Sequence, residues 1–373
     1  MTRIASSPYL EWAKLQSAAT WNLATSGVHP ATLADIGGVP HSVPLAGPNA
    51  YGYAPLLERI GAHHRVSPAQ VVTATGCSMA NFLALAALVE PGDEVLVERP
   101  TYEPLLLAAL RLGASVARFD RPASDGFRID ANVVLAAITP RTRVVVLANP
   151  HNPSSQLAPS DTLRRIGEAA HRVGARVLVC ETYLDAVFDD APGSCVHFGP
   201  AFVSTASLTK VYGLSSLRCG WVIADESLVP RIWRLNDLYG NVQPFITDWL
   251  AAAAFDCLPA LGARARALLD LNHAVFAEWA AGRDDLAFAL PAWGTTVCAR
   301  PTRVDAERLC DELRGRYEVS VVPGRFFEAP DHVRIGLCGE TAVLREGLSR
   351  IGECLTTLRD TPRSEGRPSV ESA

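Results

Sequence analysis

Lysine is almost absent from this chain of 373 residues. Of its 34 basic side chains only Lys14 and Lys210 are lysine, and all the others are arginine. Arginine keeps its proton in a protein, whereas a buried lysine can lose it. A lysine within an apolar segment is therefore a candidate for amine chemistry, which singles out Lys210. Lys14 lies in a polar N-terminal segment, where the same argument assigns it no role.

Other absences narrow the class of protein. The net charge is −5 and no run of basic residues occurs, which argues against a nucleic acid or an anionic membrane as partner. No apolar stretch is long enough to span a membrane, and the first residues lack the apolar core of a signal peptide. The nine cysteines form no CxxC pair and no Cys/His cluster. We therefore expect a cytoplasmic protein with reduced thiols and no metal site.

The middle of the chain alternates strand and helix patterns. The apolar stretches "QVVTATG", "EVLVERP" and "TRVVVLANP" have strand character, and each one leads into a helical segment. Repeated strand–helix units are typical of a mostly parallel sheet with helices on both faces. We expect an α/β fold with one large domain over residues 46–240, in which ligands bind at the carboxyl ends of the strands.

The pattern changes after this large domain. An apolar helical run predicts an interdomain helix over residues 241–275, and mixed signals predict a smaller α+β domain over residues 276–360. Residues 1–45 are expected to form an N-terminal arm and part of the smaller domain. The polar stretch 361–373 contains Pro, Ser and Gly and is predicted to be a flexible tail.

The stretch "STASLTKVYGLSSLRCGW" carries most of the chemical signal. Ser207 precedes Lys210 by three residues, and Arg218 follows it by eight. An amine with a hydroxyl and a guanidinium nearby suits a Schiff-base lysine beside a bound phosphate. The turn "TGCSM" opens a predicted helix, where the free backbone N–H groups of Cys77 and Ser78 would hold an anion.

Together with "ANPHNPSS", these segments resemble the class I and II aminotransferases, fold-type I enzymes that depend on pyridoxal 5'-phosphate (PLP). The resemblance extends over nearly the whole chain, from "NAYGYAPLLERI" to "HVRIGLC", with the motifs in the family's order. It implies the fold of aspartate aminotransferase, an α-amino acid as substrate, and a homodimer with its active sites at the subunit interface.

The resemblance also implies roles for the residues around the cofactor. Lys210 would form the Schiff base with PLP and move the substrate proton. The phosphate would be held by the residues of two loops, Cys77, Ser78, Ser207 and Arg218.

Further implied roles concern the ring and the substrate. Tyr102 would stack on the pyridine ring, and Asn152 and Tyr183 would bond its phenolic oxygen. Arg334 would bind the substrate α-carboxylate with its two-pronged guanidinium, together with Asn152. The arm at Ser26 and Gly27 would close over the substrate, whereas His151 is interpreted as a spacer in the catalytic turn.

The clearest departure from the family pattern is in "VLVCETY". The family has an aspartate where this chain has Cys180, and that carboxylate keeps the pyridine nitrogen protonated, which makes the ring a strong electron sink. A thiol is a weak hydrogen-bond donor, and a thiolate needs a lowered pKa. Glu181 cannot take the role, because adjacent strand residues point to opposite faces.

Smaller departures occur in the neighbouring loops. Two of the family's glycines are replaced by Ser155 and Ser216, which predicts a reshaped pocket. The tyrosine that related enzymes donate to the phosphate of the neighbouring subunit is missing, because Gly47 stands in its place. Tyr51 or Tyr53 is a possible substitute.

Three interpretations of Cys180 remain open. The enzyme is an aminotransferase that tolerates the change. Alternatively, a neutral ring disfavours transamination and favours elimination or replacement of a β or γ group in specialised biosynthesis, with a sulfonium such as S-adenosylmethionine among the possible substrates. In the third, the protein binds PLP without turnover. A DNA-binding regulator of this fold is not favoured, because no helix-turn-helix pattern or basic patch occurs.

Overall fold

A seven-stranded sheet forms the centre of the larger lobe in the computed structural model, which describes residues 6–38 and 42–360. The strand order is β2-β8-β7-β6-β5-β3-β4, and all neighbours are parallel except β8, which runs antiparallel to both β2 and β7. The predicted tail, residues 361–373, lies outside the described residues. The strands are β2 (Val71–Thr75), β3 (Glu94–Arg99), β4 (Ser115–Asp120), β5 (Thr142–Ala148), β6 (Arg176–Cys180), β7 (Phe202–Ser207) and β8 (Cys219–Ile223).

Alternate residues of these strands enter two different cores. Val95, Val97 and Leu178 pack against the helices of one face, whereas Leu96 and Val177 pack against those of the other. Because successive strand side chains point to opposite faces, burial on both sides favours apolar residues at consecutive positions of a strand. The helices of this lobe are α2 (Ala54–His64), α3 (Gly76–Leu88), α4 (Glu103–Arg111), α5 (Ala131–Ala137), α6 (Ser160–Arg172), α7 (Val229–Tyr239) and α8 (Phe245–Asp256).

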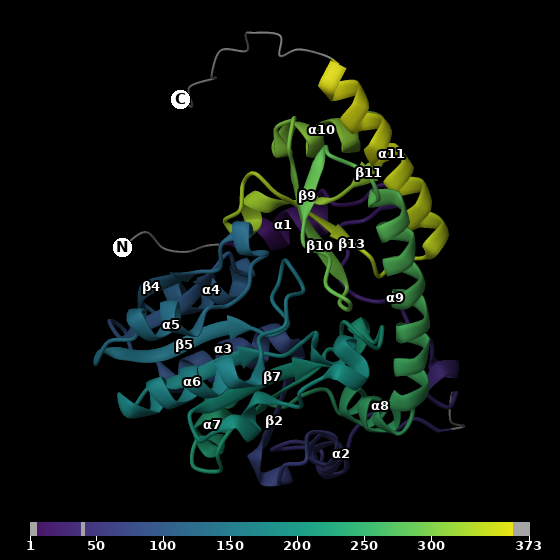
Figure 1. The fold of residues 1–373 in the computed structure, drawn as a ribbon. Helices are drawn as coiled ribbons and strands as arrows, with labels where there is room; N and C mark the ends of the chain where they lie inside the picture. Colours follow the sequence, from purple (N-terminus) through teal and green to yellow (C-terminus); the bar gives the residue numbers. More distant parts are fainter. Residues whose placement is uncertain (1–5, 39–41, 361–373) are drawn as a thin grey trace, which may run out of the picture.

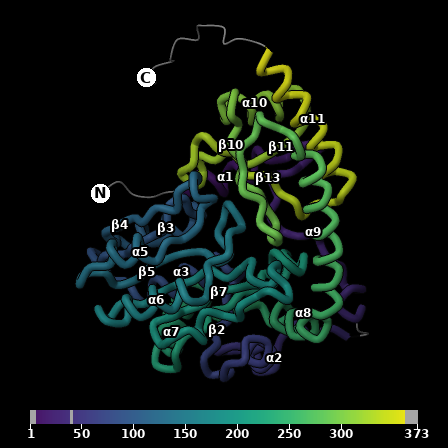
Figure 2. The backbone as a smooth tube through the Cα atoms, in the orientation of Figure 1, coloured from purple at the N-terminus to yellow at the C-terminus, as the bar shows by residue number. Residues whose placement is uncertain are grey.

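The smaller lobe contains an antiparallel four-stranded sheet with the order β12-β13-β10-β9. β1 pairs in parallel with β11, so Trp21 and Asn22 join this lobe. Figures 1 and 2 show the two lobes, with α9 along one edge of the molecule between them. The elements are α1 (Pro8–Leu15), β1 (Trp21–Asn22), α9 (Leu258–Ala280), β9 (Leu286–Phe288), β10 (Thr296–Pro301), α10 (Ala306–Arg316), β11 (Val319–Ser320), β12 (Val322–Pro323), β13 (Val333–Gly336) and α11 (Thr341–Asp360).

The single interdomain helix predicted over residues 241–275 is wrong in its form. The segment contains two helices, α8 and α9, which meet at Cys257 with a bend of 73°. Pro259 lies in the first turn of α9, where it has no N–H to continue the hydrogen bonding of α8. Among the described residues no single helix is long and apolar enough to cross a membrane, and α8 and α9 pass that test only as this bent pair.

Candidate active site

A cavity of about 540 Å³ lies where β6 and β7 end and α3 begins. This is the edge of the sheet where parallel α/β folds bind ligands. The lining brings together ten of the residues selected from the sequence: Ser26, Cys77, Ser78, Tyr102, Asn152, Cys180, Tyr183, Ser207, Lys210 and Arg218. Gly27 and Arg334 are not among the lining residues, but Gly27 lies against Lys210 and Arg334 donates to Asn152.

Lys210 is held by the N-terminal arm. Its Nζ donates to the Ser26 hydroxyl at 3.2 Å, and the Tyr183 hydroxyl donates to the same oxygen at 2.9 Å. The backbone oxygen of Lys210 accepts from Val28 N at 2.7 Å. A Cβ on Gly27 would lie 3.5 Å from Lys210 Cδ, so the arm runs directly along the lysine stem. The position of the lysine amine is therefore set by Ser26 of the N-terminal arm, which is itself bonded to Tyr183 of the larger lobe.

One end of the cavity is suited to an anion. The first-turn N–H groups of α3 have no partner within the helix, and the side chain of its N-cap Thr75 does not cap them, because its hydroxyl donates to Gln243 Oε1. Gly76 has φ +76°, and a Cβ there would lie 2.3 Å from Arg218 Nη2. The guanidinium thus reaches the helix terminus only because residue 76 is glycine. The buried Thr209 hydroxyl, which also lines the cavity, has no hydrogen-bond partner.

Cys180 ends β6 inside the cavity, and its sulfur is surrounded by polar groups: it accepts from Asn81 Nδ2 and donates to Thr182 Oγ1. Cys77 Sγ lies 3.6 Å away, Asn81 Nδ2 3.7 Å and Thr182 Oγ1 3.6 Å. The contact with Cys77 lowers the pKa of Cys180 to about 6, and Thr182 and Asn81 act in the same direction against burial. The same contact raises the pKa of Cys77 well above its usual value. The contact between the two sulfurs therefore favours a negative charge on Cys180 over one on Cys77.

Glu181 faces the other side of the sheet, as predicted. Its carboxylate accepts from the Ser194 hydroxyl and from Cys195 N, both at 2.7 Å. It is buried at 3% exposure and is not part of the cavity lining. Burial raises its pKa, although these hydrogen bonds oppose the change. Glu181 is therefore a structural group and not a substitute for the missing aspartate.

Arg334 on β13 is buried behind the cavity at 1% exposure. Its Nη1 donates to Asn152 Oδ1 at 2.9 Å, and its Nη2 donates to the Tyr9 hydroxyl at 3.1 Å and to Ala24 O at 3.1 Å. Asn152 and Tyr9 line the cavity, whereas the guanidinium does not. Both terminal nitrogens of the Arg334 guanidinium, which were expected to bind a carboxylate, are thus already bonded to groups of this chain.

His151 is more than the spacer inferred from the sequence. Its Nε2 lies 3.0 Å from Pro100 O, and its Nδ1 lies 2.7 Å from Ser154 Oγ. A carbonyl only accepts, so Nε2 carries the proton and Nδ1 accepts from the hydroxyl. Burial, reinforced by the charge of Arg121, keeps the pKa of His151 well below its usual value, so the ring is neutral. His151 ties the loop of Asn152 to the loop that leads into Tyr102.

Neither serine that replaces a family glycine lines the cavity, so the predicted reshaping of the pocket is wrong in its direct form. Ser155 adopts φ +59°, and its hydroxyl donates to Thr296 O at 2.9 Å, which links the larger lobe to β10. Ser216 is exposed. A Cβ on Gly47 would lie 2.2 Å from the Phe245 ring, so packing accounts for that glycine.

Tyr51 and Tyr53 do not reach the cavity of their own chain. Tyr51 is exposed, and Arg234 lies over its ring at 4.2 Å. Tyr53 packs edge-on against Phe245 at 5.2 Å between ring centroids. Whether either tyrosine contacts the phosphate of a second subunit stays a prediction.

Several residues that line the cavity were not predicted from the sequence. Tyr9, Leu10, Ala13 and Lys14 come from one face of α1, and Asn81 and Thr182 complete the surroundings of Cys180. Asn81 could have been found, because it lies one turn after Cys77 on the same helix face. The α1 residues gave no such signal, since only the tertiary fold brings α1 to the cavity. Both lysines of the chain line this one cavity.

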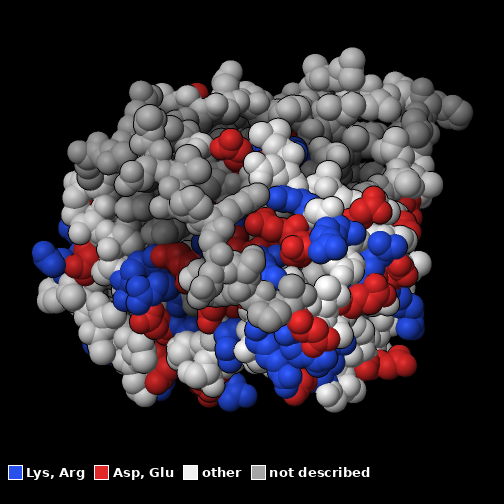
Figure 3. All heavy atoms as spheres, turned by 90° about the horizontal axis from the view of Figure 1, so that it is seen from above, with Lys and Arg blue, Asp and Glu red and all other residues white. Residues whose placement is uncertain are grey.

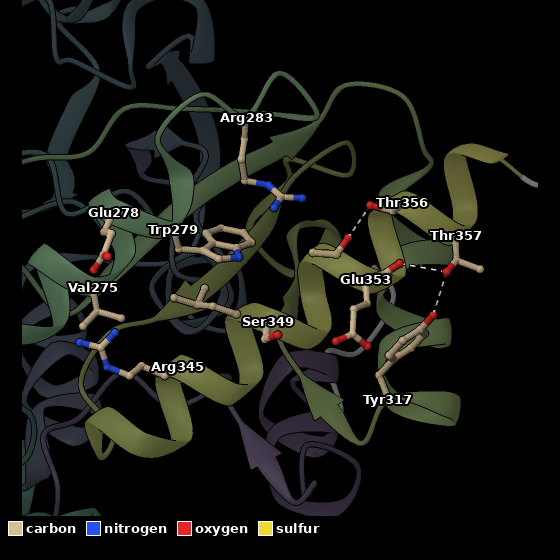
Figure 4. A pocket seen from close by; sticks show the side chains of 12 residues that line it. Val275, Glu278, Trp279, Arg283, Tyr317, Arg345, Ser349, Glu353, Thr356 and Thr357 are labelled. Carbon is tan, nitrogen blue, oxygen red and sulfur yellow. Dashed lines mark hydrogen bonds between the residues drawn. The ribbon is translucent and has the colours of Figure 1, made fainter.

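A second hollow, of about 910 Å³, lies in the smaller lobe between α9 and α11. Figure 4 shows Trp279 beside Arg283, whose guanidinium carbon lies 4.6 Å from the ring centroid, and Tyr317 bonded to Thr357 at 3.2 Å. None of the predicted site residues lines it.

On the face in Figure 3, basic and acidic side chains are interspersed.

Comparisons with known proteins agree with this fold. The family model described as aminotransferase class I and II matches residues 47–351. Arginine–pyruvate transaminase from Pseudomonas aeruginosa is 32% identical over 333 residues, covering 84% of each chain. Capreomycidine synthase from Streptomyces vinaceus is 32% identical over 307 residues, covering 81% of this chain and 79% of that protein. The solved structure of OrfR, a PLP-dependent cyclase, has a TM-score of 0.85 at 26% identity and covers 96% of this chain and 98% of that one.

Proposed function

This chain belongs to the class I and II aminotransferases, a PLP-dependent family, and on that premise we propose that it transfers the amino group of an α-amino acid at the cavity around Lys210. The observation that carries the proposal is the position of the Lys210 amine. It shares the Ser26 hydroxyl with Tyr183, in the same cavity as the anion site of Gly76 and Arg218. A hydroxyl that accepts two hydrogen bonds keeps its own proton available for a third partner.

The residues present fit the cofactor. The start of α3, the guanidinium of Arg218 and the unpartnered Thr209 hydroxyl would hold its phosphate, because all three supply donors to an anion. The phenol of Tyr102 would lie against the ring, and burial raises the pKa of Tyr102 so that it stays protonated. Bound PLP supplies an electron sink for the carbanion at the substrate Cα.

Lys210 is the base in this proposal. Its Nζ would take the proton from the substrate Cα and return it, while Tyr183 and Ser26 keep the amine in reach. General base catalysis needs this contact first and a suitable pKa second. Asn152 would orient the substrate through its side-chain amide, which is fixed by the bond from Arg334. The walls of Tyr9 and Leu10 would keep water from the reacting carbon.

Cys180 supports transamination if it acts as an anion. Asn81 donates to its sulfur, and the Cys77 thiol and the Thr182 hydroxyl lie within 3.6 Å of it. The contact with Cys77 lowers the pKa of Cys180, which favours the thiolate. A thiolate beside the ring nitrogen would keep that nitrogen protonated, which is the role of the family's aspartate. This interpretation needs no additional cation, because neutral donors stabilise the charge.

The test of attachment compares the two lysines. Lys210→Ala should lose the visible absorbance of the bound cofactor, and borohydride reduction followed by mass spectrometry should leave no modified peptide. Lys14→Arg is the matched variant, and it should retain both signals. If Lys210→Ala retains the visible band and a modified peptide, the proposal is wrong.

A second candidate is elimination, replacement or cyclisation on the same cofactor. Cys180 in place of a carboxylate favours it, and two similar proteins are named a synthase and a cyclase. Single-turnover mixing with amino acids separates the two. Transamination converts the cofactor to its aminated form and releases a 2-oxo acid, whereas elimination releases a leaving group and regenerates the starting spectrum. Cys180→Asp should leave the amination rate within about a factor of three if the thiolate is the native state, and raise it strongly if the thiol is neutral.

The charge of the cavity bears on the substrate. No aspartate or glutamate lines it among the described residues, whereas Lys14 does; Lys210 and Arg218 also line it, but they are assigned to the cofactor. A neutral or anionic side chain is therefore favoured over the guanidinium group that one relative's name indicates. Competition between glutamate, methionine and arginine for the same cofactor amination would rank the three classes.

A homodimer is the proposed assembly. Large apolar side chains are exposed around the end of α7, with Leu238 at 77% and Tyr239 at 55% exposure. Tyr51 packs edge-on against Trp233 of the same helix. Contiguous exposed apolar surface marks interaction sites. Light scattering of the native protein and of Leu238→Asp should give a dimer and a monomer, respectively.

A further inference from the structure

Helix α1 is fixed over the cavity by contacts with both lobes. The Tyr9 amide donates to the Glu103 carboxylate of α4 at 3.0 Å, and the Ser7 hydroxyl donates to the same oxygen. Trp12 packs against Phe326, with 5.5 Å between the ring centroids. A negatively charged partner at the start of a helix also suits the helix dipole. Tyr9 is thus presented by an anchored element, at 8% exposure.

The hydroxyl of Tyr9 lies between the cavity and Arg334. The guanidinium donates to it from Nη2 at 3.1 Å, and also to Ala24 O and, from Nη1, to Asn152 Oδ1. Arg334 Nε is buried without a partner. Tyr9 and Asn152 line the cavity, but Arg334 does not. A carboxylate that enters the cavity therefore meets the phenol before it meets the guanidinium.

A guanidinium has only donors, so the Tyr9 oxygen must accept the bond from Arg334. The phenol proton then remains to be donated, and no described residue accepts it in the hydrogen bonds of this structure. Burial raises the pKa of Tyr9, but the charges of Arg334 and Lys210 outweigh it, so the pKa is lowered overall. A phenol polarised in this way is a good donor to an anion.

We propose that Tyr9 is a substrate-binding residue, whose hydroxyl accepts from Arg334 and donates its proton to the substrate α-carboxylate. This inference rests on the proposed function, because it concerns the substrate of that site. The positive charge of Arg334 acts through the phenol, and Asn152 supplies the neighbouring contact. Glu103 is a positioning residue for Tyr9, since it fixes the start of α1.

Tyr9→Phe removes the hydroxyl and keeps the ring that packs against Tyr102 and Phe327. We expect KM for the fastest-reacting L-amino acid of a panel to rise about 10- to 100-fold, as for a hydrogen bond to a charged group, with little change in kcat. A primary amine of the same side chain that lacks the carboxylate should show no such change. Tyr317→Phe, which removes a hydroxyl bonded to Thr357 in the smaller lobe, is the control and should behave as the native protein.

A second readout does not depend on turnover. Titration calorimetry with 3-phenylpropionate, a carboxylate without an amine, should show weaker binding to Tyr9→Phe than to the native holoenzyme by the same factor. Circular dichroism checks that both tyrosine variants fold. Glu103→Gln should weaken carboxylate binding less than Tyr9→Phe does.

The opposite result identifies the competing role. If KM and the calorimetric dissociation constant fall in Tyr9→Phe, the hydroxyl competes with the carboxylate for Arg334 and the proposal is overturned. Unchanged values in both assays overturn it as well. If none of the tested amino acids aminates the cofactor of the native protein, the proposed function fails. The calorimetric comparison still decides the role of Tyr9 in that case.

Discussion

Acid is expected to destabilise this protein through one buried histidine, His64 at the end of α2. Its Nε2 accepts from Trp221 Nε1 at 3.0 Å, and an indole N–H can only donate. The ring must therefore be neutral, with its proton on Nδ1. Burial, and then the neighbouring His63, lower the pKa of His64 to about 3 from 6.5. Protonation would break the bond to Trp221 and place a second charge beside His63.

The sign and size of the effect follow from linkage. The folded state binds this proton more weakly than the unfolded chain, so stability is highest above the unfolded pKa and falls as the pH drops below it. Between pH 8 and pH 5 the loss is about 2 kcal/mol, from an unfolded pKa of 6.5 and a folded pKa of about 3. A folded pKa one unit higher hardly changes this figure, because the folded state would still be mostly unprotonated at pH 5.

The assay is urea unfolding at pH 8 and pH 5, followed by tryptophan fluorescence. His64→Gln supplies an amide oxygen for Trp221 that does not titrate. The loss between the two pH values should therefore be smaller than in the native protein by about 2 kcal/mol. His171→Gln, at an exposed position of α6, should keep the full loss. Equal losses in the native protein and in His64→Gln would refute the reasoning.

Three further predictions concern the site. Gly76→Ala should weaken cofactor binding at least about tenfold, because residue 76 has a positive φ and the added Cβ meets Arg218. Gly92→Ala, with φ +93° and open space around it, should lower stability without changing cofactor binding. Equilibrium dialysis measures the binding, and thermal melts measure the stability. Lys14→Glu should shift substrate preference from glutamate toward arginine by about tenfold or more in competition assays. His151→Phe should lower stability by about 1–3 kcal/mol through the orphaned Ser154 and Pro100 groups, measured in urea.

Much of this fold could be predicted because local patterns agreed with the tertiary structure. The centres of β3 and β6, residues 95–97 and 177–179, are apolar at consecutive positions, as burial on both faces favours, and the strands alternate with helices. The break at Cys257 was missed because the apolar pattern continues through it, and Pro259 is compatible with the first turn of a new helix. Periodicity does not report the direction of a helix axis.

The site residues on loops were found by their order and chemistry, whereas those on α1 were not. Lys210 and Arg218 share one segment, so their spacing could be read directly. Tyr9 reaches Arg334 across 325 positions of sequence, and nothing local in "SPYLEWAKL" indicates that contact. The surroundings of Cys180 could not be predicted either, because Asn81 lies on α3 and Thr182 in the loop after β6.

The scarcity of lysine has a practical consequence for chemical labelling. Apart from the α-amine of the chain, every primary amine of this protein lines one cavity. An amine-reactive dye would therefore act as a reporter of cavity occupancy, and its rate of attachment would fall as ligand fills the space. Coupling the protein to a support through amines would block the cavity, so immobilisation should go through another chemistry, such as the half-exposed thiol of Cys257.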